Sequence, residues 1–427
     1  MTRPRFSTVF AVTLALLAVV LLAAAVALGY TSEPRGKTVL TVRLWDPQVA
    51  TAYRQSLDEF TRRHPDIEVR VNVVAYSSYF DTLRTDVASG GADDIFWISN
   101  AYLSGYADNG RLMPIEKSDA WEPSVVRQFT RDDVLWGVPQ LTDAGIAVYY
   151  NADLLAAAGV APDVLDEVRW SPDAAKDTLR PLLAKLTSTS GGRTQWGYNA
   201  ANDLQGIYLN YVGSAGGMFQ QGDRFAFDNP QAATAFRYLV SLINDDRVSP
   251  PAADTNNNGD FSRNQFLAGH MAMFQSGTYN LAAIAEQATF GWGVAMLPAG
   301  PTGRVSVTNG IAAAGNSATK HPDAVRQVLA WLGSTEGNAY VGTSGAAIPA
   351  VLAAQQVYFD YWSARGVDVS PFFRVLDGLQ IPAPGGSGFA AGYQAITPYF
   401  DEMFLGREPV EAALAQAQAA ANAAAAP

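Results

Sequence analysis

The 427-residue sequence contains no cysteine. This absence excludes disulfide bonds, cysteine-ligated zinc, iron–sulfur clusters, thiol catalysis and lipid attachment through an N-terminal cysteine. Histidine is also scarce, because His64, His270 and His321 are the only three, and no two have the short spacing of a metal-binding pair. No G-x-S-x-G motif marks a nucleophilic serine. We therefore expect no metal, no cofactor and no catalytic residues.

Charge is the second scarce property. Charged residues make up 16% of the chain, and the net charge is −11. An acidic protein is poorly suited to bind nucleic acid or anionic lipid through bulk charge. The hydrophobic content of 48% is typical of a globular protein, and the length suits two domains of roughly 150 residues or more. We expect a globular monomer without a nucleic-acid partner.

The longest apolar run lies at the N-terminus. Arg3 and Arg5 precede residues 9–28, in which Thr13 is the only polar side chain. This is the pattern of an export signal. At about 20 residues, the run is also long enough to cross a bilayer as a helix. Residues 1–37 are therefore a signal peptide or a membrane anchor. The length favours retention, which would tether the body outside the cytoplasm, at the cell surface or in the periplasm.

The next hundred residues alternate between strand-like and helix-like patterns. The segments follow in the order strand, helix, strand, helix, strand, over residues 38–44, 49–63, 67–73, 77–88 and 94–98. This order predicts an α/β fold with a mainly parallel sheet. After residue 152 helical patterns dominate, including one expected helix over residues 171–188, with a return to strand at residues 292–298.

Three strand-like segments end in an aromatic residue beside a small polar one. They end at Trp45-Asp46, at Trp97 followed by Asn100, and at Tyr150-Asn151. Ligands of open α/β sheets bind at the carboxyl ends of the strands. A flat apolar ring beside a hydrogen-bonding group suits a sugar, which has one apolar face and a rim of hydroxyls. Two other readings are a helix-capping role for Asp46 and simple core packing for the rings.

Further segments in a characteristic order give the chain a family resemblance. They include Ala92–Trp97, Trp136–Pro139, Val148–Leu155, Phe266–Met273, Met296–Pro298 and Asp323–Val325. With Trp45-Asp46, they make the chain similar to the extracellular solute-binding proteins of ABC importers, in the carbohydrate branch that includes maltose-binding protein. The resemblance implies two α/β lobes joined by three hinge crossings. Lobe one would comprise residues 38–142 and 293–342, and lobe two residues 147–290 and 347–420. The crossings would lie near residues 143–146, 290–292 and 343–345.

The resemblance also assigns roles at the site. Asp46 would accept sugar hydroxyls, Trp97 and Asn100 would form a stacking and polar pair, and Asp143 would be a hinge carboxylate. From lobe two, Tyr279 after Ser276 would be an aromatic platform and Tyr393 a second one. Asn309-Gly310 would approach the ligand through its backbone, with Gln205 and Arg374 as further candidates. The family often has a carboxylate at the place of Asn100, and Trp is common at the place of Tyr279.

The function that the resemblance implies is the capture of a carbohydrate between the lobes and its delivery to the permease subunits of an ABC importer. An amino sugar fits if Asp46 and Asp143 face its ammonium group. The alternatives are a secreted glycosidase or lyase, which would need two carboxylates about 5–10 Å apart, and an importer subunit that binds a glycerophosphodiester. A sensor without a transporter is a further class. Residues 254–265 match the first half of a calcium loop, but Gln265 replaces the final Glu, which favours a polar loop.

Overall fold

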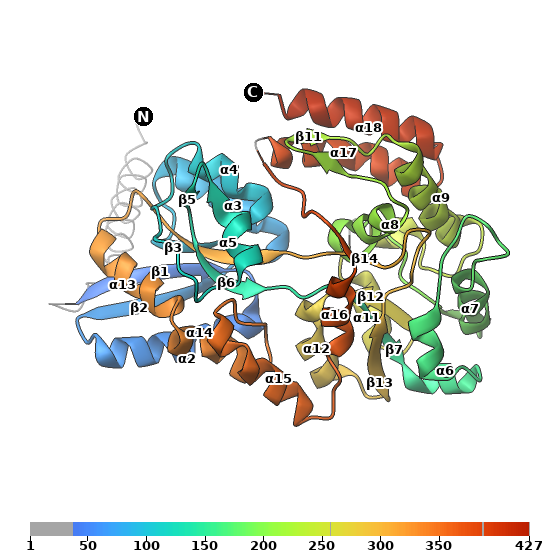
Figure 1. Cartoon of the computed structure of the whole chain (residues 1–427), viewed down its shortest axis with the longest axis horizontal. Coiled ribbons are helices and arrows are strands. Elements are labelled where there is room, and N and C mark those ends of the chain that lie inside the picture. The colour runs from blue at the N-terminus through green and yellow to red at the C-terminus, as the bar shows by residue number, and fades with distance from the viewer. Residues whose placement is uncertain (1–36, 257, 387, 427) are drawn as a thin grey trace, which may run out of the picture.

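The computed structural model describes residues 37–256, 258–386 and 388–426. Figure 1 shows two lobes side by side, with the chain crossing between them near the centre. The export signal or anchor expected at the N-terminus lies outside the described residues. Among the residues that are described, no helix has both the length and the apolar character needed to cross a membrane.

Lobe one is built on a five-stranded sheet. Its strand order is β2-β1-β3-β15-β6. The strands are β1 (Thr38–Leu44), β2 (Ile67–Val73), β3 (Ile95–Ser99), β6 (Val138–Thr142) and β15 (Gly310–Gly315). β1 runs parallel to β2 and to β3, as the sequence predicted, whereas β15 is antiparallel to β3 and β6. The carboxyl ends of β1, β2 and β3 therefore lie at one edge of the sheet.

Helices cover the sheet of lobe one on both faces (Figure 1). They are α2 (Pro47–Arg63), α3 (Tyr76–Ser89), α4 (Asn100–Ala107), α5 (Pro123–Phe129), α13 (Pro322–Leu332) and α14 (Thr335–Thr343), with the hairpin β4 (Thr130–Arg131) and β5 (Val134–Leu135). In α2 the buried residues Tyr53, Leu57 and Phe60 recur every three or four positions, so one apolar stripe faces the sheet. The helix ends at His64 before Pro65, where a further αR residue is disfavoured.

Lobe two is more helical. Its three-stranded antiparallel sheet has the order β12-β7-β13, formed by β7 (Ala147–Asn151), β12 (Met273–Ser276) and β13 (Trp292–Met296). A parallel pair joins β14 (Val305–Val307) to β16 (Leu379–Ile381), and β10 (Gln220–Gln221) pairs with β11 (Arg224–Phe225). A short hairpin consists of β8 (Ser188–Ser190) and β9 (Arg193–Gln195). The α-helices are α6 (Ala152–Ala157), α7 (Leu179–Leu186), α8 (Leu209–Ser214), α9 (Pro230–Asn244), α10 (Ala252–Thr255), α11 (Phe261–Leu267), α12 (Leu281–Gln287), α15 (Gln356–Ser363), α16 (Ser370–Arg374), α17 (Phe389–Phe404) and α18 (Val410–Ala424).

The first crossing between the lobes lies at residues 143–146, where the sequence placed it, between β6 and β7. The second lies elsewhere than expected. β13 pairs with β7, and Leu297, Val305 and Val307 belong to the lobe-two core, so the chain returns to lobe one only between β14 and β15. The two crossings run together, because the amide of Asp143 donates to the carbonyl of Asn309 at 2.7 Å. The third passage lies within residues 344–355, between α14 and α15.

The helix expected over residues 171–188 begins only at Leu179. Polar side chains of the preceding residues bind nearby backbone amides instead of allowing a helix: Ser171 accepts from the amide of Asp173, and Asp173 accepts from Ala175. Such local bonds compete with helical ones. Asp177 then accepts from the amides of Leu179 and Arg180, which starts the helix there.

Candidate functional site

The carboxyl end of β1 places Trp45 at the edge of lobe one. Trp45 is partly exposed, and four aromatic rings surround it: Tyr76, Tyr79, Phe80 and Trp97, with ring-centre distances of 4.9 to 5.7 Å. Tyr76 is 65% exposed, at the start of α3. These contacts hold Trp45 and Tyr76 as a rigid apolar surface, because edge-to-face aromatic pairs favour a fixed geometry.

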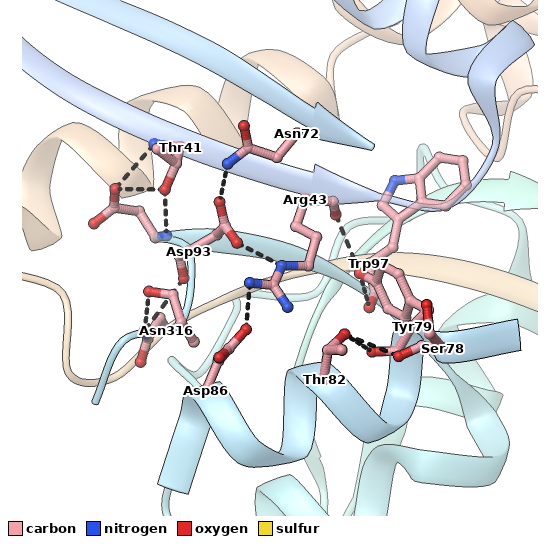
Figure 2. A network of polar contacts seen from close by, with 12 residues as sticks. Thr41, Arg43, Asn72, Ser78, Tyr79, Thr82, Asp86, Asp93, Trp97 and Asn316 are labelled. Atoms are coloured by element: carbon pink, nitrogen blue, oxygen red, sulfur yellow. Dashed lines mark hydrogen bonds and ion pairs between the residues drawn. The ribbon is translucent and has the colours of Figure 1, made fainter. Parts of the chain in front are cut away.

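A polar network ties the strands behind Trp45 to α3 (Figure 2). The hydroxyl of Tyr79 lies 2.9 Å from the carbonyl of Trp97 and 3.2 Å from that of Arg43, so one side chain joins β1 and β3. Arg43 pairs with Asp93 at 2.5 Å and with Asp86 of α3 at 2.6 Å. Arg43 and Trp45 are two residues apart and so face the same side of the sheet. The network therefore fixes the strand end that carries Trp45.

Trp97 lies in the core and not at the edge where the sequence placed it. Its side chain is 0% exposed, and its indole N–H donates to the hydroxyl of Tyr53 at 2.9 Å. The reason is position along the strand: Trp97 lies two residues before the end of β3, whereas Trp45 follows the end of β1. In this structure Trp97 supports Trp45 from behind, and its own faces contact only protein.

Asp46 caps helix α2. One carboxylate oxygen accepts from the amides of Gln48 at 2.8 Å and Val49 at 3.1 Å, so the helix-cap alternative is the observed arrangement. Asp46 remains partly exposed. Burial raises the pKa of Asp46, while the two amide bonds and Arg263 act in the opposite direction. The cap uses the same carboxylate oxygen for both amides.

Lobe two contributes Tyr279, which is 39% exposed. Tyr279 follows β12. The carboxyl end of β12, at Ser276, pairs with Ala147 at the start of β7, so this end lies beside the first crossing. Ser276 itself is buried and accepts from Asn280 at 2.8 Å, so it supports the turn. Tyr393 of α17 is partly buried and stacks on Phe389 at 5.5 Å.

Two carboxylates lie near these rings. Asp203 precedes the short π-helix Leu204–Tyr208 and accepts from the amide of Gly206 at 2.9 Å. Asp143, at the first crossing, accepts from the side-chain amide of Gln205 at 3.1 Å. Burial raises the pKa of Asp203, and it raises the pKa of Asp143 to about 6. Each carboxyl is thus easier to protonate than an aspartate in water.

Residues from the two lobes act on one another across the gap. Desolvation by the surrounding protein raises the pKa of Tyr76 in lobe one, and Tyr102, Tyr393, Asp203 and Asp143 add to the rise. Desolvation also raises the pKa of Tyr279 in lobe two, and Asp203 and Asp143 add to that rise. We call this group the interlobe site, and it consists of Trp45, Asp46, Tyr76, Asp143, Asp203, Gln205, Tyr279 and Tyr393. Aromatic faces and carboxylates that belong to different lobes therefore share one region.

Other candidates lie outside the interlobe site. Asn151 is 2% exposed and caps α6 through the amides of Asp153 and Leu154. Tyr150 packs against Gly293, and burial raises its pKa, with smaller contributions from Asp166 and Asp368. β7 begins at the first crossing, so its carboxyl end, where both residues lie, points away from lobe one.

The remaining candidates have structural contacts. Arg374 pairs with Asp166 at 3.4 Å on the outside of lobe two. The carbonyl of Asn309 accepts from Asp143 and so joins the two crossings, whereas the amide of Gly310 donates to Gln128 of α5 at 2.9 Å and so attaches β15 to lobe one. Asn100 begins α4, and its side-chain nitrogen lies 3.4 Å from the carbonyl oxygen of Ala383 in lobe two. Asn100 thus marks a direct contact between the lobes.

Sequence reasoning missed Tyr76, Asp203 and Arg263. Tyr76 follows the end of β2, so the strand-end rule that selected Trp45 would also have selected it. No sequence pattern distinguishes Asp203, apart from its place two residues before Gln205. Arg263 lies on a helix of the other lobe. Among the described residues, no three His, Asp or Glu side chains gather as metal ligands would.

The chain matches known proteins along most of its length. The model of the family described as bacterial extracellular solute-binding protein matches residues 46–339. A putative binding protein of Brucella abortus is 24% identical over 404 residues, which cover 92% of this chain and 94% of the relative.

Solved structures match the same fold. The crystal structure of M. tuberculosis UspC is 72% identical, with a TM-score of 0.73, and the match covers 91% of this chain and all of that one. The ABC substrate-binding protein Lmo0181 of Listeria monocytogenes, solved with cycloalternan, has a TM-score of 0.80 at 20% identity and covers 91% and 98% of the two chains. The latter likeness shows the two-lobe fold.

Proposed function

The chain belongs to the bacterial extracellular solute-binding proteins, and we propose that it is a sugar-binding member of this family, which captures an amino sugar between its lobes and delivers it to the permease of an ABC importer. The observation that carries this proposal is the interlobe site. Trp45 and Tyr76 of lobe one and Tyr279 of lobe two present aromatic faces, and Asp143 and Asp203 lie among them. Stacking surfaces with convergent polar groups suit a sugar ring.

The carboxylates support a positively charged sugar. Asp46 and Asp143 are partly buried, and burial raises the pKa of both, so each ionised carboxylate lacks full solvation in the free protein. An ammonium group between them would restore favourable interactions, because a nearby positive charge stabilises the ionised form. A neutral sugar would offer hydroxyl donors but no compensating charge. The cycloalternan bound to the Listeria relative supports a carbohydrate in general.

Closure of the two lobes is the proposed mechanism. Each lobe carries part of the interlobe site, and the first two crossings run side by side through Asp143 and Asn309. A ligand that contacts Trp45 on one lobe and Tyr279 on the other gains all its contacts only when the lobes approach, so it shifts the population toward the closed form. We expect binding without turnover.

The test is a calorimetric titration of the purified protein. The panel consists of D-glucosamine, D-glucose, N-acetyl-D-glucosamine and a glycerophosphodiester, with each ligand first checked by thermal shift. We expect D-glucosamine to bind more tightly than the two sugars that lack the ammonium group. Equal affinity for D-glucose and D-glucosamine would overturn the charge argument. Preference for the phosphodiester would overturn the sugar assignment, and hydrolysis of a glycoside would overturn the binding function.

Delivery and location are tested separately. Uptake of labelled D-glucosamine by cells that lack the chain should fall and should return when the chain is restored. We also propose that the apolar run at residues 9–28 stays attached as a tether, because it is long enough to span a bilayer and no cysteine is present for a lipid anchor. The mass of the mature protein distinguishes an intact N-terminus from a cleaved one.

A further inference from the structure

A cavity of about 550 Å³ lies in lobe two, next to the lobe boundary. One wall is the segment 213–223 and the other is β16 with residues 382–385, and Asn100 is the one described residue of lobe one in the lining. None of the residues of the interlobe site lines it. We call it the lobe-two cavity. Its volume lies within the range of about 300–1,000 Å³ that small-molecule sites occupy.

The lining is mainly apolar and carries one charge. Met218 is 45% exposed and Leu379 is 62% exposed, although large apolar side chains are usually covered. Val305 and Ile381 lie beneath them in the core. Among the described residues that line the cavity, Asp223 is the only charged one, and it is exposed. An apolar floor with one carboxylate favours a ligand with an apolar body and a positive end.

One wall of the cavity is held firmly in place. The side-chain amide of Gln220 both accepts from the amide of Gly385 at 2.8 Å and donates to its carbonyl at 3.2 Å. From the other side, the side-chain nitrogen of Asn100 lies 3.4 and 3.5 Å from the carbonyls of Ala383 and Pro384. The same segment continues into α17, which carries Tyr393, as Figure 1 shows for the chain that rises from the centre to α17. The cavity therefore has a preformed wall, as ligand sites usually do.

We propose that the lobe-two cavity is a second ligand site, which takes a small cationic amphiphile, that is, an amine or quaternary ammonium with a short apolar chain. Such a ligand would cover Met218 and Leu379 with its chain and place its charge beside Asp223. The site is independent of the interlobe site, because the two share no residue.

The test follows the methyl group of Met218 by NMR in protein labelled with ¹³C-methyl methionine. The other five methionines of the described chain are at most 7% exposed, so Met218 is the one reporter among them at the cavity. The probes are hexylammonium, hexanol and hexanoate, and Met218→Leu assigns the signal. We expect hexylammonium to shift the Met218 signal saturably, with an affinity about 2- to 5-fold above hexanol, the effect of one exposed charge pair, and hexanoate to bind most weakly.

Two variants separate the charge from other effects. Asp223→Asn should abolish the preference for hexylammonium over hexanol, whereas Asp81→Asn, at an exposed aspartate on lobe one, should leave it unchanged. No saturable shift of Met218, or equal binding of hexanoate and hexylammonium, would overturn the proposal. Because no probe is a sugar, failure here leaves the amino-sugar proposal standing, and failure of the sugar panel leaves this one standing.

Discussion

Replacing Asp143 with asparagine should stabilise the free protein and weaken amino-sugar binding at the same time. Burial raises the pKa of Asp143 to about 6, from 3.8 for an ordinary aspartate. The folded state therefore binds the proton more tightly than the unfolded state, so the ionised carboxylate destabilises the fold at neutral pH. This cost declines as the pH falls from about 6 toward 3.8, because the folded protein takes up the proton first.

The magnitude follows from the size of the pKa difference. A pKa difference of about two units between the folded and the unfolded state corresponds to at most about 3 kcal/mol of unfolding free energy at pH 7.5. For a body of this size, an unfolding entropy of about 0.8 kcal/mol/K converts that into an increase of up to about 4 °C in Tm. The asparagine side chain of the variant would keep an amide group within reach of Gln205. Losing a charged hydrogen bond of about 1.5–3 kcal/mol should weaken D-glucosamine binding by roughly 10- to 100-fold.

The assay is scanning calorimetry at pH 7.5 and pH 4.5, followed by titration with D-glucosamine. Asp143→Asn should raise Tm at pH 7.5, and at pH 4.5 it should raise Tm by only about a third as much, because the folded carboxyl is then protonated while the unfolded one is still mostly ionised. Asp81→Asn serves as the control at an exposed position. A Tm increase of the same size at both pH values, or an unchanged affinity for D-glucosamine, would refute the reasoning about this carboxylate.

Further substitutions test the aromatic part of the interlobe site. Trp97→Ala should lower the unfolding free energy by about 3–5 kcal/mol, because Trp97 is fully buried, and an unchanged urea midpoint would contradict its place in the core. Sugar binding should weaken several-fold, by about 0.5–1.5 kcal/mol or more per ring, in each of the variants Trp45→Ala, Tyr76→Ala and Tyr279→Ala. Tyr76→Ala should have little effect on stability. Unchanged affinities of all three variants by titration would argue against stacking. Tyr79→Phe should lower the unfolding free energy by about 1–2 kcal/mol by removing its hydrogen bonds to β1 and β3, and stability unchanged in urea would show that the bonds are not needed. For the wild type, the affinity for D-glucosamine should decline below about pH 6 as Asp143 takes up a proton, while that for D-glucose should stay level.

The fold was readable from sequence where the hydrophobic pattern was regular. β1 and β2 have the predicted bounds, because alternating β-branched residues define a strand closely. The sequence pattern predicts β13 as a strand but does not indicate which sheet the strand joins. The second crossing was misplaced for this reason. The pairing of β13 with β7 depends on contacts between segments far apart in the chain.

The site was readable only in part, for a related reason. The strand-end rule applies to parallel strands, and it selected Trp45 correctly as a residue at the edge of lobe one. It failed for Tyr150 and Asn151, because both neighbours of β7 run antiparallel to it and its carboxyl end lies far from lobe one. Strand direction in lobe two could not be read from local patterns. The same antiparallel arrangement explains why Tyr279, after β12, does reach the lobe boundary.

The most direct test of the central claim is a crystal structure of the protein with the sugar that gives the largest thermal shift in the panel. The account predicts density for the sugar ring between Trp45 and Tyr76 of lobe one and Tyr279 of lobe two, with its amino group within hydrogen-bonding distance of Asp143 or Asp203. A sugar bound to one lobe alone, or with its amino group directed away from both Asp143 and Asp203, would contradict it.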